Sequence, residues 1–297
     1  KMYEITIDTD VCKKDGLCAM ACPRGILRQE EKRTLPQIVT ADLEHCFLCG
    51  QCVSICPSEA ISHSHFPEGT VTPIKSEQVP TYDQALELIH SRRSKRSFRD
   101  RTVERSVIEK VLEAARFAPS EPNTQTTEFV VIRDKAMIHQ IGALTADYYA
   151  ALARRIQNPI GKAMFRLMVG PRSMQVILEY LPEMEGLVSL YHEGTDFILN
   201  DTPVLLLFCA DSAGGFPDVN ASLAVQNATL AAEALGLGCF YAGFVARACK
   251  RDDRIARLVS LPDTHQIYGV LAMGYPRFRF RNWPQRNPAK VTWVEAA

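Results

Sequence analysis

The chain has 297 residues, 46% of them hydrophobic, which is long enough for two domains and at least one large core. Its 34 Lys and Arg residues balance 34 Asp and Glu residues, and a net charge of zero argues against nucleic acid or an anionic membrane as a partner. No apolar stretch reaches the roughly 18 residues that a membrane-spanning helix needs.

Residues 1–68 contain two similar halves, each with a short expected strand (Met2–Ile7 and Leu35–Val39), a cysteine loop and a Cys-Pro pair. The second half reads Cys46-Phe-Leu-Cys49-Gly-Gln-Cys52-Val-Ser-Ile-Cys56-Pro57, the C-x2-C-x2-C-x3-C-P spacing that binds an iron–sulfur cluster. The first half has Cys12, Cys18 and Cys22-Pro23, with Asp15 in place of a second cysteine. This duplication resembles a bacterial two-cluster ferredoxin, and the resemblance covers the whole segment.

Ligation in two-cluster ferredoxins is crossed between the halves. The resemblance therefore implies one cluster on Cys22, Cys46, Cys49 and Cys52, and a second on Cys12, Cys18 and Cys56, with Asp15 opposite its fourth iron. Three outcomes are open at that iron: Asp15 ligates a 4Fe–4S cluster, water does, or the site holds a 3Fe–4S cluster. We favour Asp15, because a carboxylate in the position of a cysteine can reach iron as an anion. Retention of the other three thiolates argues against a cluster that no longer assembles.

Thiolate clusters of this kind belong to a reducing compartment, so we expect the protein in the cytoplasm. The remaining cysteines have structural interpretations: Cys209 and Cys239 are predicted to fill the core, and Cys249 to be a surface thiol. His63 and His65 are predicted to be solvated residues before a linker at residues 69–80, in a stretch rich in Pro and Gly.

A different domain is expected over residues 81–297. Thr81 and Gln84 form a capping-box pattern before a helix, and apolar residues at helical spacing predict a second helix over 107–115. Residues 135–199 are predicted to be mostly helical, with breaks at Gly161, Gly170-Pro171 and Pro182. The other expected elements are strands at Phe129–Ile132, Val204–Ala210, Cys239–Phe244 and Tyr268–Met273, and an Ala-rich helix at Ala221–Leu235. This order predicts the α+β class, with helices packed around a small, mostly antiparallel sheet.

A basic run, Arg92-Arg93-Ser94-Lys95-Arg96, ends the first of these helices. The planar fork of arginine grips phosphate at two points, so a phosphorylated ligand is one interpretation. A solvated basic helix end, favoured by the helix dipole, fits this run equally well.

Three later motifs favour the ligand: Ala118-Pro119-Ser120-Glu-Pro-Asn123-Thr-Gln125, Leu235-Gly-Leu-Gly-Cys-Phe-Tyr-Ala242-Gly243-Phe244, and Gly274-Tyr275-Pro276 followed by Arg277, Arg279, Arg281 and Arg286. With the basic run they resemble, in order and spacing, the flavin-dependent nitroreductase family over about residues 80–297. The resemblance implies an FMN site. In it Arg92 and Ser94 bind the phosphate and ribityl chain, Arg93 contributes through its backbone, and Arg96 lies near the pyrimidine end of the flavin.

The same resemblance assigns the other residues of the site. Asn123 resembles the amide that hydrogen-bonds the isoalloxazine ring, with Pro119 and Ser120 shaping the loop beneath it. Ala242 and Gly243 stand where the family directs backbone N–H groups at flavin N5 and O4. Arg281 and Arg286 are candidates for closing over the phosphate. The family is a homodimer with FMN in the interface, and the alanines of residues 221–234 fit either a contact between subunits or an ordinary core helix.

Together the two domains predict an enzyme. Electrons would pass singly from the clusters to FMN and leave as a hydride from flavin N5 to a small organic acceptor, such as a nitroaromatic or a quinone. Residues 135–199 are the expected lid, and the expected donor is a ferredoxin or another low-potential protein, with NAD(P)H also open. Other flavin chemistry stays open too: reductive dehalogenation, ene reduction or substrate oxidation. A non-catalytic electron-transfer or redox-sensing protein would have no open pocket over the flavin.

Overall fold

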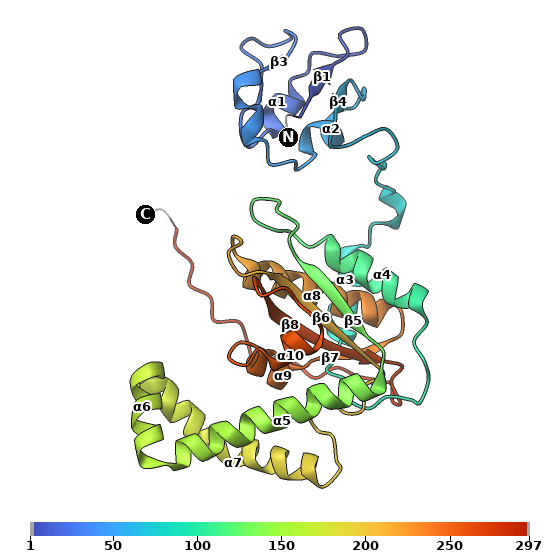
Figure 1. The fold of residues 1–297 in the computed structure, drawn as a ribbon. Coiled ribbons are helices and arrows are strands. Elements are labelled where there is room, and N and C mark those ends of the chain that lie inside the picture. The colour runs from blue at the N-terminus through green and yellow to red at the C-terminus, as the bar shows by residue number, and fades with distance from the viewer. Residues whose placement is uncertain (1–2, 296–297) are drawn as a thin grey trace. The chain divides into compact units, whose positions relative to one another are not determined.

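The computed structural model describes residues 3–295, so Met2, with which the first expected strand begins, lies outside the described residues. The chain forms two compact units, drawn in Figure 1. The first comprises the residues up to Pro80 together with Glu121–Thr124, and the second comprises the rest. No helix of the described chain is both long and apolar enough to cross a membrane.

The first unit consists of two small antiparallel strand pairs and two short helices. Strand β1 (Ile5–Ile7) pairs with β4 (Ile61–His63), and β2 (Leu27–Arg28) pairs with β3 (Gln37–Ile38). The helices follow the cysteine loops and are α1 (Leu17–Ala21) and α2 (Gln51–Ile55), with a 3-10 segment η1 (Thr40–His45) between β3 and α2.

The duplication seen in the sequence is also present in the backbone of this unit. Both α1 and α2 begin after a glycine with positive φ, Gly16 (76°) and Gly50 (73°), a conformation that a residue with a Cβ rarely adopts. The small apolar core consists of Ile5, Cys18, Ile26, Leu27 and Ile61. It lies against several of the other cysteines, so the core and the cysteine loops stabilise one another.

The second unit is built on a four-stranded sheet in the order β5-β6-β8-β7, in which every pair of neighbours is antiparallel. Its strands are β5 (Glu128–Ile132), β6 (Val204–Asp211), β7 (Gly238–Tyr241) and β8 (His265–Gly274). This arrangement confirms the predicted α+β class with a mostly antiparallel sheet.

Helices cover both faces of this sheet, as Figure 1 shows. Alternate residues of β6 point to opposite faces: Leu205 and Leu207 pack with one set of helices, and Leu206 and Phe208 with the other. The first set is α5 (Lys135–Gln157), α7 (Pro171–His192), α9 (Gly243–Cys249) and α10 (Arg254–Leu258). The other set is α4 (Arg105–Arg116) and α8 (Pro217–Ala234), with α3 (Tyr82–Ser91) beside α8.

The capping box predicted for α3 is present, because Thr81 Oγ1 accepts from the Gln84 N–H and the Gln84 side chain accepts from the Thr81 N–H. Four of the six alanines of α8 are at most 1% exposed and pack into the core of their own chain: Ala221, Ala224, Ala228 and Ala232. Of the two interpretations of this helix, the core helix is therefore the one that its alanines fit.

The helical segment 135–199 differs from its prediction in where the helices end. Helix α6 (Pro159–Val169) connects α5 to α7, which pack against each other, and the chain turns at Asn158-Pro159 and Gly170-Pro171. The predicted breaks at Gly161 and Pro182 are wrong. Gly161 lies in the first turn of α6, where its N–H donates to the Asn158 side chain, and Pro182 is tolerated on an exposed position of α7.

Two other predictions fail because a helix begins early. The strand expected over 239–244 ends at Tyr241, since α9 starts at Gly243. That helix carries Cys249 inward, where it is 7% exposed and burial raises the pKa of its thiol to about 12. Cys249 is therefore a core residue and not a surface thiol. Cys209 and Cys239 are also buried in the core, as predicted.

Candidate functional site

Four cysteines of the first unit lie around one cavity: Cys22, Cys46, Cys49 and Cys52. Burial raises the pKa of the Cys52 thiol to about 11, and the neighbouring thiols of the other three add to the increase. A metal reverses this cost, because a coordinated thiol loses its proton. Cys22, from the first of the two similar halves of residues 1–68, thus lies beside three cysteines of the second half.

The other three cysteines form a second group. Burial raises the pKa of the Cys18 thiol, and the nearby thiols of Cys56 and Cys12 raise it further. Asp15 lies in the loop between Cys12 and Cys18, is exposed, and accepts a hydrogen bond from the Leu17 N–H at 3.1 Å. The seven thiols are therefore divided in space as crossed ligation requires.

The surroundings of these thiols fit iron–sulfur clusters. Three thiols accept a backbone hydrogen bond: Cys22 from Ile26 (3.3 Å), Cys46 from Leu48 (3.4 Å) and Cys56 from Ala60 (3.3 Å). Such bonds stabilise the thiolate that binds iron. Among residues 3–295 no three His, Cys, Asp or Glu side chains converge on a single ion. A cluster does not need that convergence, because each of its irons takes its own protein ligand.

His63 contradicts its prediction as a solvated residue. It is the last residue of β4, on the same face as Ile61, and is only 3% exposed, whereas His65 is exposed. Its Nδ1 accepts from the His65 N–H at 3.1 Å, and its Nε2 lies 3.6 Å from Cys46 Sγ. Burial lowers the pKa of the His63 imidazole, and His65 lowers it further.

In the second unit, the basic run 92–96 divides its side chains between two sides of an extended segment. Successive side chains of an extended backbone alternate, which places Arg92, Ser94 and Arg96 on one side. Each of these three lines a cavity. Lys95 points the other way and its Nζ lies 2.7 Å from both carboxylate oxygens of Glu233 in α8. Two arginines and a serine of the run can therefore contact a ligand, whereas its lysine forms an ion pair within the fold.

Two neighbouring cavities share the end of β7. The smaller, about 310 Å³, is lined by Arg92 and Ser94, while the larger, about 750 Å³, is lined by Arg96. Phe240 and Tyr241 line both. The Arg96 guanidinium carbon lies 5.4 Å from the centre of the Phe240 ring, a cation–π contact that fixes the arginine at the larger cavity.

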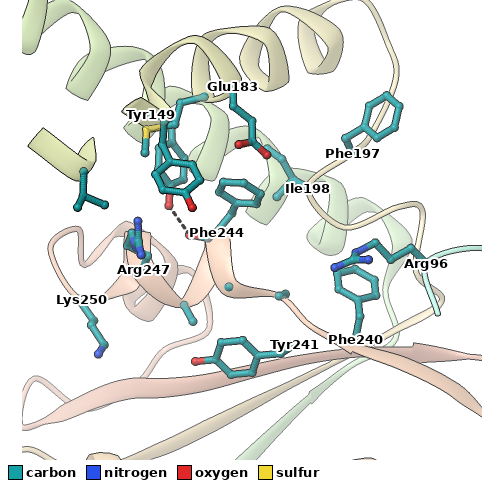
Figure 2. Close-up of a pocket in the computed structure, with 16 residues that line it drawn as sticks. Arg96, Tyr149, Glu183, Phe197, Ile198, Phe240, Tyr241, Phe244, Arg247 and Lys250 are labelled. Atoms are coloured by element: carbon teal, nitrogen blue, oxygen red, sulfur yellow. Dashed lines mark hydrogen bonds between the residues drawn. The ribbon is translucent and has the colours of Figure 1, made fainter. Parts of the chain in front are cut away.

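The larger cavity lies between the sheet and α7, with aromatic side chains around it (Figure 2). Tyr241 lies on the sheet side of this cavity and Glu183 of α7 on the opposite side. Arg247 of α9 and Lys250, the residue that follows α9, lie at one end. The buried hydroxyl of Tyr149 donates to the Phe244 carbonyl at 3.2 Å, and burial holds its pKa above the usual range. The lining of the larger cavity is mainly apolar with a few charged groups, as binding sites for small molecules usually are.

The two residues expected to present backbone N–H groups differ in what the structure allows. The Ala242 N–H donates to the Val270 carbonyl at 2.9 Å, so it is used within the sheet, and the prediction that it points at a flavin is wrong. Gly243 is the first residue of α9, where N–H groups have no acceptor within the helix. Both residues line the larger cavity, and Gly243 is the one whose N–H can face a ligand.

The loop residues Pro119, Ser120 and Asn123 do not line either cavity of this chain. Ser120 Oγ accepts from the Gln125 N–H at 2.9 Å, which shapes the loop. Asn123 belongs to the first unit, where its Nδ2 donates to the carbonyls of Phe47 (3.2 Å) and Leu48 (2.8 Å). Both amide hydrogens of Asn123 are therefore used within the first unit.

The arginine-rich tail is fixed at one point near the basic run. Trp283 stacks on His90 at the end of α3, with ring centres 3.9 Å apart. Arg281 and Arg286, on either side of this contact, are exposed. Arg277 is held elsewhere, because its Nε donates to the Phe98 carbonyl at 2.8 Å.

A domain with two groups of thiols, joined in one chain to a sheet domain with a cationic and aromatic cavity, defines a redox enzyme that carries its own electron-transfer domain. The chain belongs to the Nitroreductase family, which its residues 89–275 match. Residues 4–60 match the 4Fe-4S dicluster domain. The protein is thus an oxidoreductase with a ferredoxin domain at its amino-terminal side.

Three proteins illustrate what the chain is similar to. A protein of Methanothermobacter thermautotrophicus named NADH dehydrogenase/NAD(P)H nitroreductase is 29% identical over 64% of this chain and 76% of its own length. Human iodotyrosine deiodinase 1 is 35% identical over 27% of this chain and 25% of its own. The solved structure of a Bacteroides fragilis nitroreductase with bound FMN superposes with a TM-score of 0.53, at 18% identity, over 71% of this chain and 99% of that one. This last likeness concerns the fold.

Proposed function

We propose that this protein passes electrons from two iron–sulfur clusters to FMN and on to a small organic acceptor such as a nitroaromatic or a quinone. The observation that carries the proposal is the cavity of about 750 Å³ beside Arg96 and Gly243, in a chain that also has a dicluster domain. A relay without turnover would need no such space.

The proposed FMN site joins the two cavities that share Phe240 and Tyr241. Arg92 and Ser94 would hold the phosphate end, and Arg96 would favour negative charge on the flavin in a partly dry site. Bound FMN would supply the chemistry, since it takes up electrons one at a time and delivers two as a hydride. Trp283 brings the tail near the phosphate end, where Arg281 and Arg286 would close the site, with Arg93 contributing through its backbone.

The proposed clusters rest on the two groups of thiols. Cys22, Cys46, Cys49 and Cys52 would hold one 4Fe–4S cluster, and Cys12, Cys18 and Cys56 the other, with Asp15 on its fourth iron. The thiolates need a reducing environment, so a cytoplasmic location and a ferredoxin-type donor are part of the proposal. The nicotinamide in the name of the archaeal relative keeps NAD(P)H as the other donor to test.

We propose that the active protein is a homodimer. The loop of Pro119 and Ser120 carries a flavin-site motif but lines neither cavity of its own chain. A second copy supplying this loop would complete the site. The same loop carries Asn123, which would then act through its backbone position and not through a free amide.

An anaerobic experiment tests the electron path. With reduced ferredoxin as donor, the flavin of the assembled protein should bleach, and a nitroaromatic or quinone should then reoxidise it. Reduction of a nitro group to nitroso takes two electrons and two protons and releases one water. Cys52→Ser should keep FMN, but its flavin should be bleached much more slowly by reduced ferredoxin. The control Cys249→Ala changes a buried cysteine far from the clusters in sequence, and its flavin should be bleached at the wild-type rate. Equal bleaching in both variants would contradict the path.

Reductive dehalogenation is the second candidate, favoured by the similarity to iodotyrosine deiodinase over part of the chain. It replaces a carbon–halogen bond by a carbon–hydrogen bond, using two electrons and one proton and releasing halide. The same assay decides between the candidates, because a panel of halophenols and nitroaromatics gives either halide release or nitro reduction.

A further inference from the structure

The two halves of the ferredoxin domain differ at a second pair of equivalent positions besides Asp15 and Cys49. His63 follows Cys56 at the same spacing as Gln29 follows Cys22. The Gln29 amide donates to two backbone carbonyls, those of Lys14 (3.1 Å) and Thr34 (2.7 Å). His63, at the equivalent position of the second half, differs from Gln29 because its side chain contacts the thiol of Cys46.

The hydrogen bonds of His63 fix which ring nitrogen carries the proton. A neutral imidazole has one donor nitrogen and one acceptor nitrogen. Because Nδ1 accepts from the His65 N–H at 3.1 Å, the proton lies on Nε2, which is 3.6 Å from Cys46 Sγ. The ring is held in this orientation by Tyr3 and Phe66, whose ring centres lie 6.1 and 5.3 Å from its own. The side chain is thus set to donate an N–H to the sulfur.

We propose that His63 is a positioning residue that donates from Nε2 to the Cys46 thiolate and raises the reduction potential of the cluster bound by Cys22, Cys46, Cys49 and Cys52. Reduction adds negative charge to the cluster, and a donor at a ligating sulfur stabilises the reduced state more than the oxidised one. The inference rests on the proposed function, because it requires that these thiols hold a cluster.

Within residues 3–295, the other cluster has no imidazole donor at its thiols, and its side-chain donor is a hydroxyl. Among the described residues, the corresponding Gln29 is engaged by backbone carbonyls, and the nearest side-chain group at a thiol is the Ser58 hydroxyl, 3.7 Å from Cys56 Sγ. The two clusters therefore differ in their side-chain donors, an imidazole N–H at Cys46 and a hydroxyl at Cys56, and the variants of His63 should change only the first midpoint potential.

The test uses the full chain, assembled anaerobically with clusters and FMN. Electron paramagnetic resonance during stepwise reduction gives the midpoint potential of each cluster. His63→Leu removes the donor, and His63→Gln keeps an amide N–H. His65→Leu is the matched control, since it removes a neighbouring imidazole, whose ring centre lies 6.3 Å from that of His63, but keeps the backbone N–H that bonds to Nδ1. We expect His63→Leu to lower one midpoint enough to change the electron distribution between the clusters about tenfold, which is about 59 mV. His63→Gln should recover part of this shift, and His65→Leu should show none.

Unchanged midpoints in His63→Leu, or equal shifts of both clusters, would overturn the inference alone. A wild-type chain that assembles no cluster would contradict the proposed function as well. If His63→Leu fails to assemble, histidine labelled with ¹⁵N decides in the wild-type chain and in His65→Leu. Magnetic coupling of a histidine nitrogen to one reduced cluster in both proteins supports the donor, and its absence refutes it.

Discussion

Lys95 and Glu233 form the most buried ion pair of the described chain, and its removal tests how the basic run is built. The two side chains are 9% and 14% exposed, and Lys95 Nζ lies 2.7 Å from both carboxylate oxygens. Lys95→Met removes one partner and leaves the Glu233 carboxylate, whose side chain is 14% exposed, without its cation. Such a change costs about 3–5 kcal/mol of unfolding free energy, because the remaining charge loses its compensation.

The assay is urea unfolding followed by circular dichroism at fixed FMN concentration, because ligand binding itself shifts apparent stability. At about 1.4 kcal/mol per tenfold, the expected loss changes the unfolding equilibrium at least about 100-fold. Lys135→Met is the matched control. Lys135 pairs with Asp100 at 3.2 Å, but these side chains are 79% and 93% exposed, so its loss should cost under about 1 kcal/mol.

The double variant Lys95→Met/Glu233→Met separates a structural lysine from a ligand-binding one. Replacing both charges by apolar groups of similar size is often nearly neutral, so stability should return to within about 1 kcal/mol of wild type. FMN affinity should return with it, because Arg92, Ser94 and Arg96 lie on the other side of the segment. The reasoning is refuted if Lys95→Met costs no more than Lys135→Met. It is also refuted if the double variant is stable but does not bind FMN.

Three further predictions use other parts of the chain. Asp15→Ala should release one iron per chain and leave the signal of an oxidised 3Fe cluster in electron paramagnetic resonance, while Asp15→Cys should retain all the iron; equal iron content in both would remove Asp15 as a ligand. Trp283→Ala should weaken FMN binding about tenfold, measured by fluorescence titration, because the tail loses its stacking on His90, and unchanged affinity would show that the tail does not close the site. Leu207→Ala should lower the unfolding free energy by about 2–5 kcal/mol in urea, since this side chain is 0% exposed in the central strand, and a loss under about 1 kcal/mol would contradict that burial.

The fold could be predicted from the sequence wherever a local pattern decides the outcome. The capping box of Thr81 and the apolar strand at residues 204–210 are decided by neighbouring residues, and both are found as predicted. Pro182 was harder, because a proline ends a helix only if no tertiary packing holds the two sides together. Helix α7 packs against α5, and this packing is a long-range property that the local sequence does not contain.

The candidate site shows the same division. Spacing alone indicated the cysteines, whereas Arg92, Ser94 and Arg96 were predicted from the resemblance to a family. The orientation of His63 depends on the pairing of β4 with β1, which brings His63 opposite Ile5 and turns its ring inward. The signal that could have revealed it is the alternation of Ile61 and His63 around exposed Ser62. The use of the Ala242 N–H by Val270 likewise depends on strand pairing and has no local signature.

Two of the differences between the halves of the ferredoxin domain, Asp15 opposite Cys49 and His63 opposite Gln29, act in the same direction. A carboxylate is a harder ligand than a thiolate and favours the more highly charged, oxidised iron, so Asp15 as a ligand would lower the potential of its cluster. The N–H of His63 would raise the potential of the other cluster. Where these two effects together exceed that of the Ser58 hydroxyl at Cys56, an electron entering at the Asp15 cluster would move downhill in energy to the cluster of Cys46. Because the sequence change and the buried ring lie on different clusters, each can be removed alone, and the same measurement of midpoint potentials shows whether their effects add.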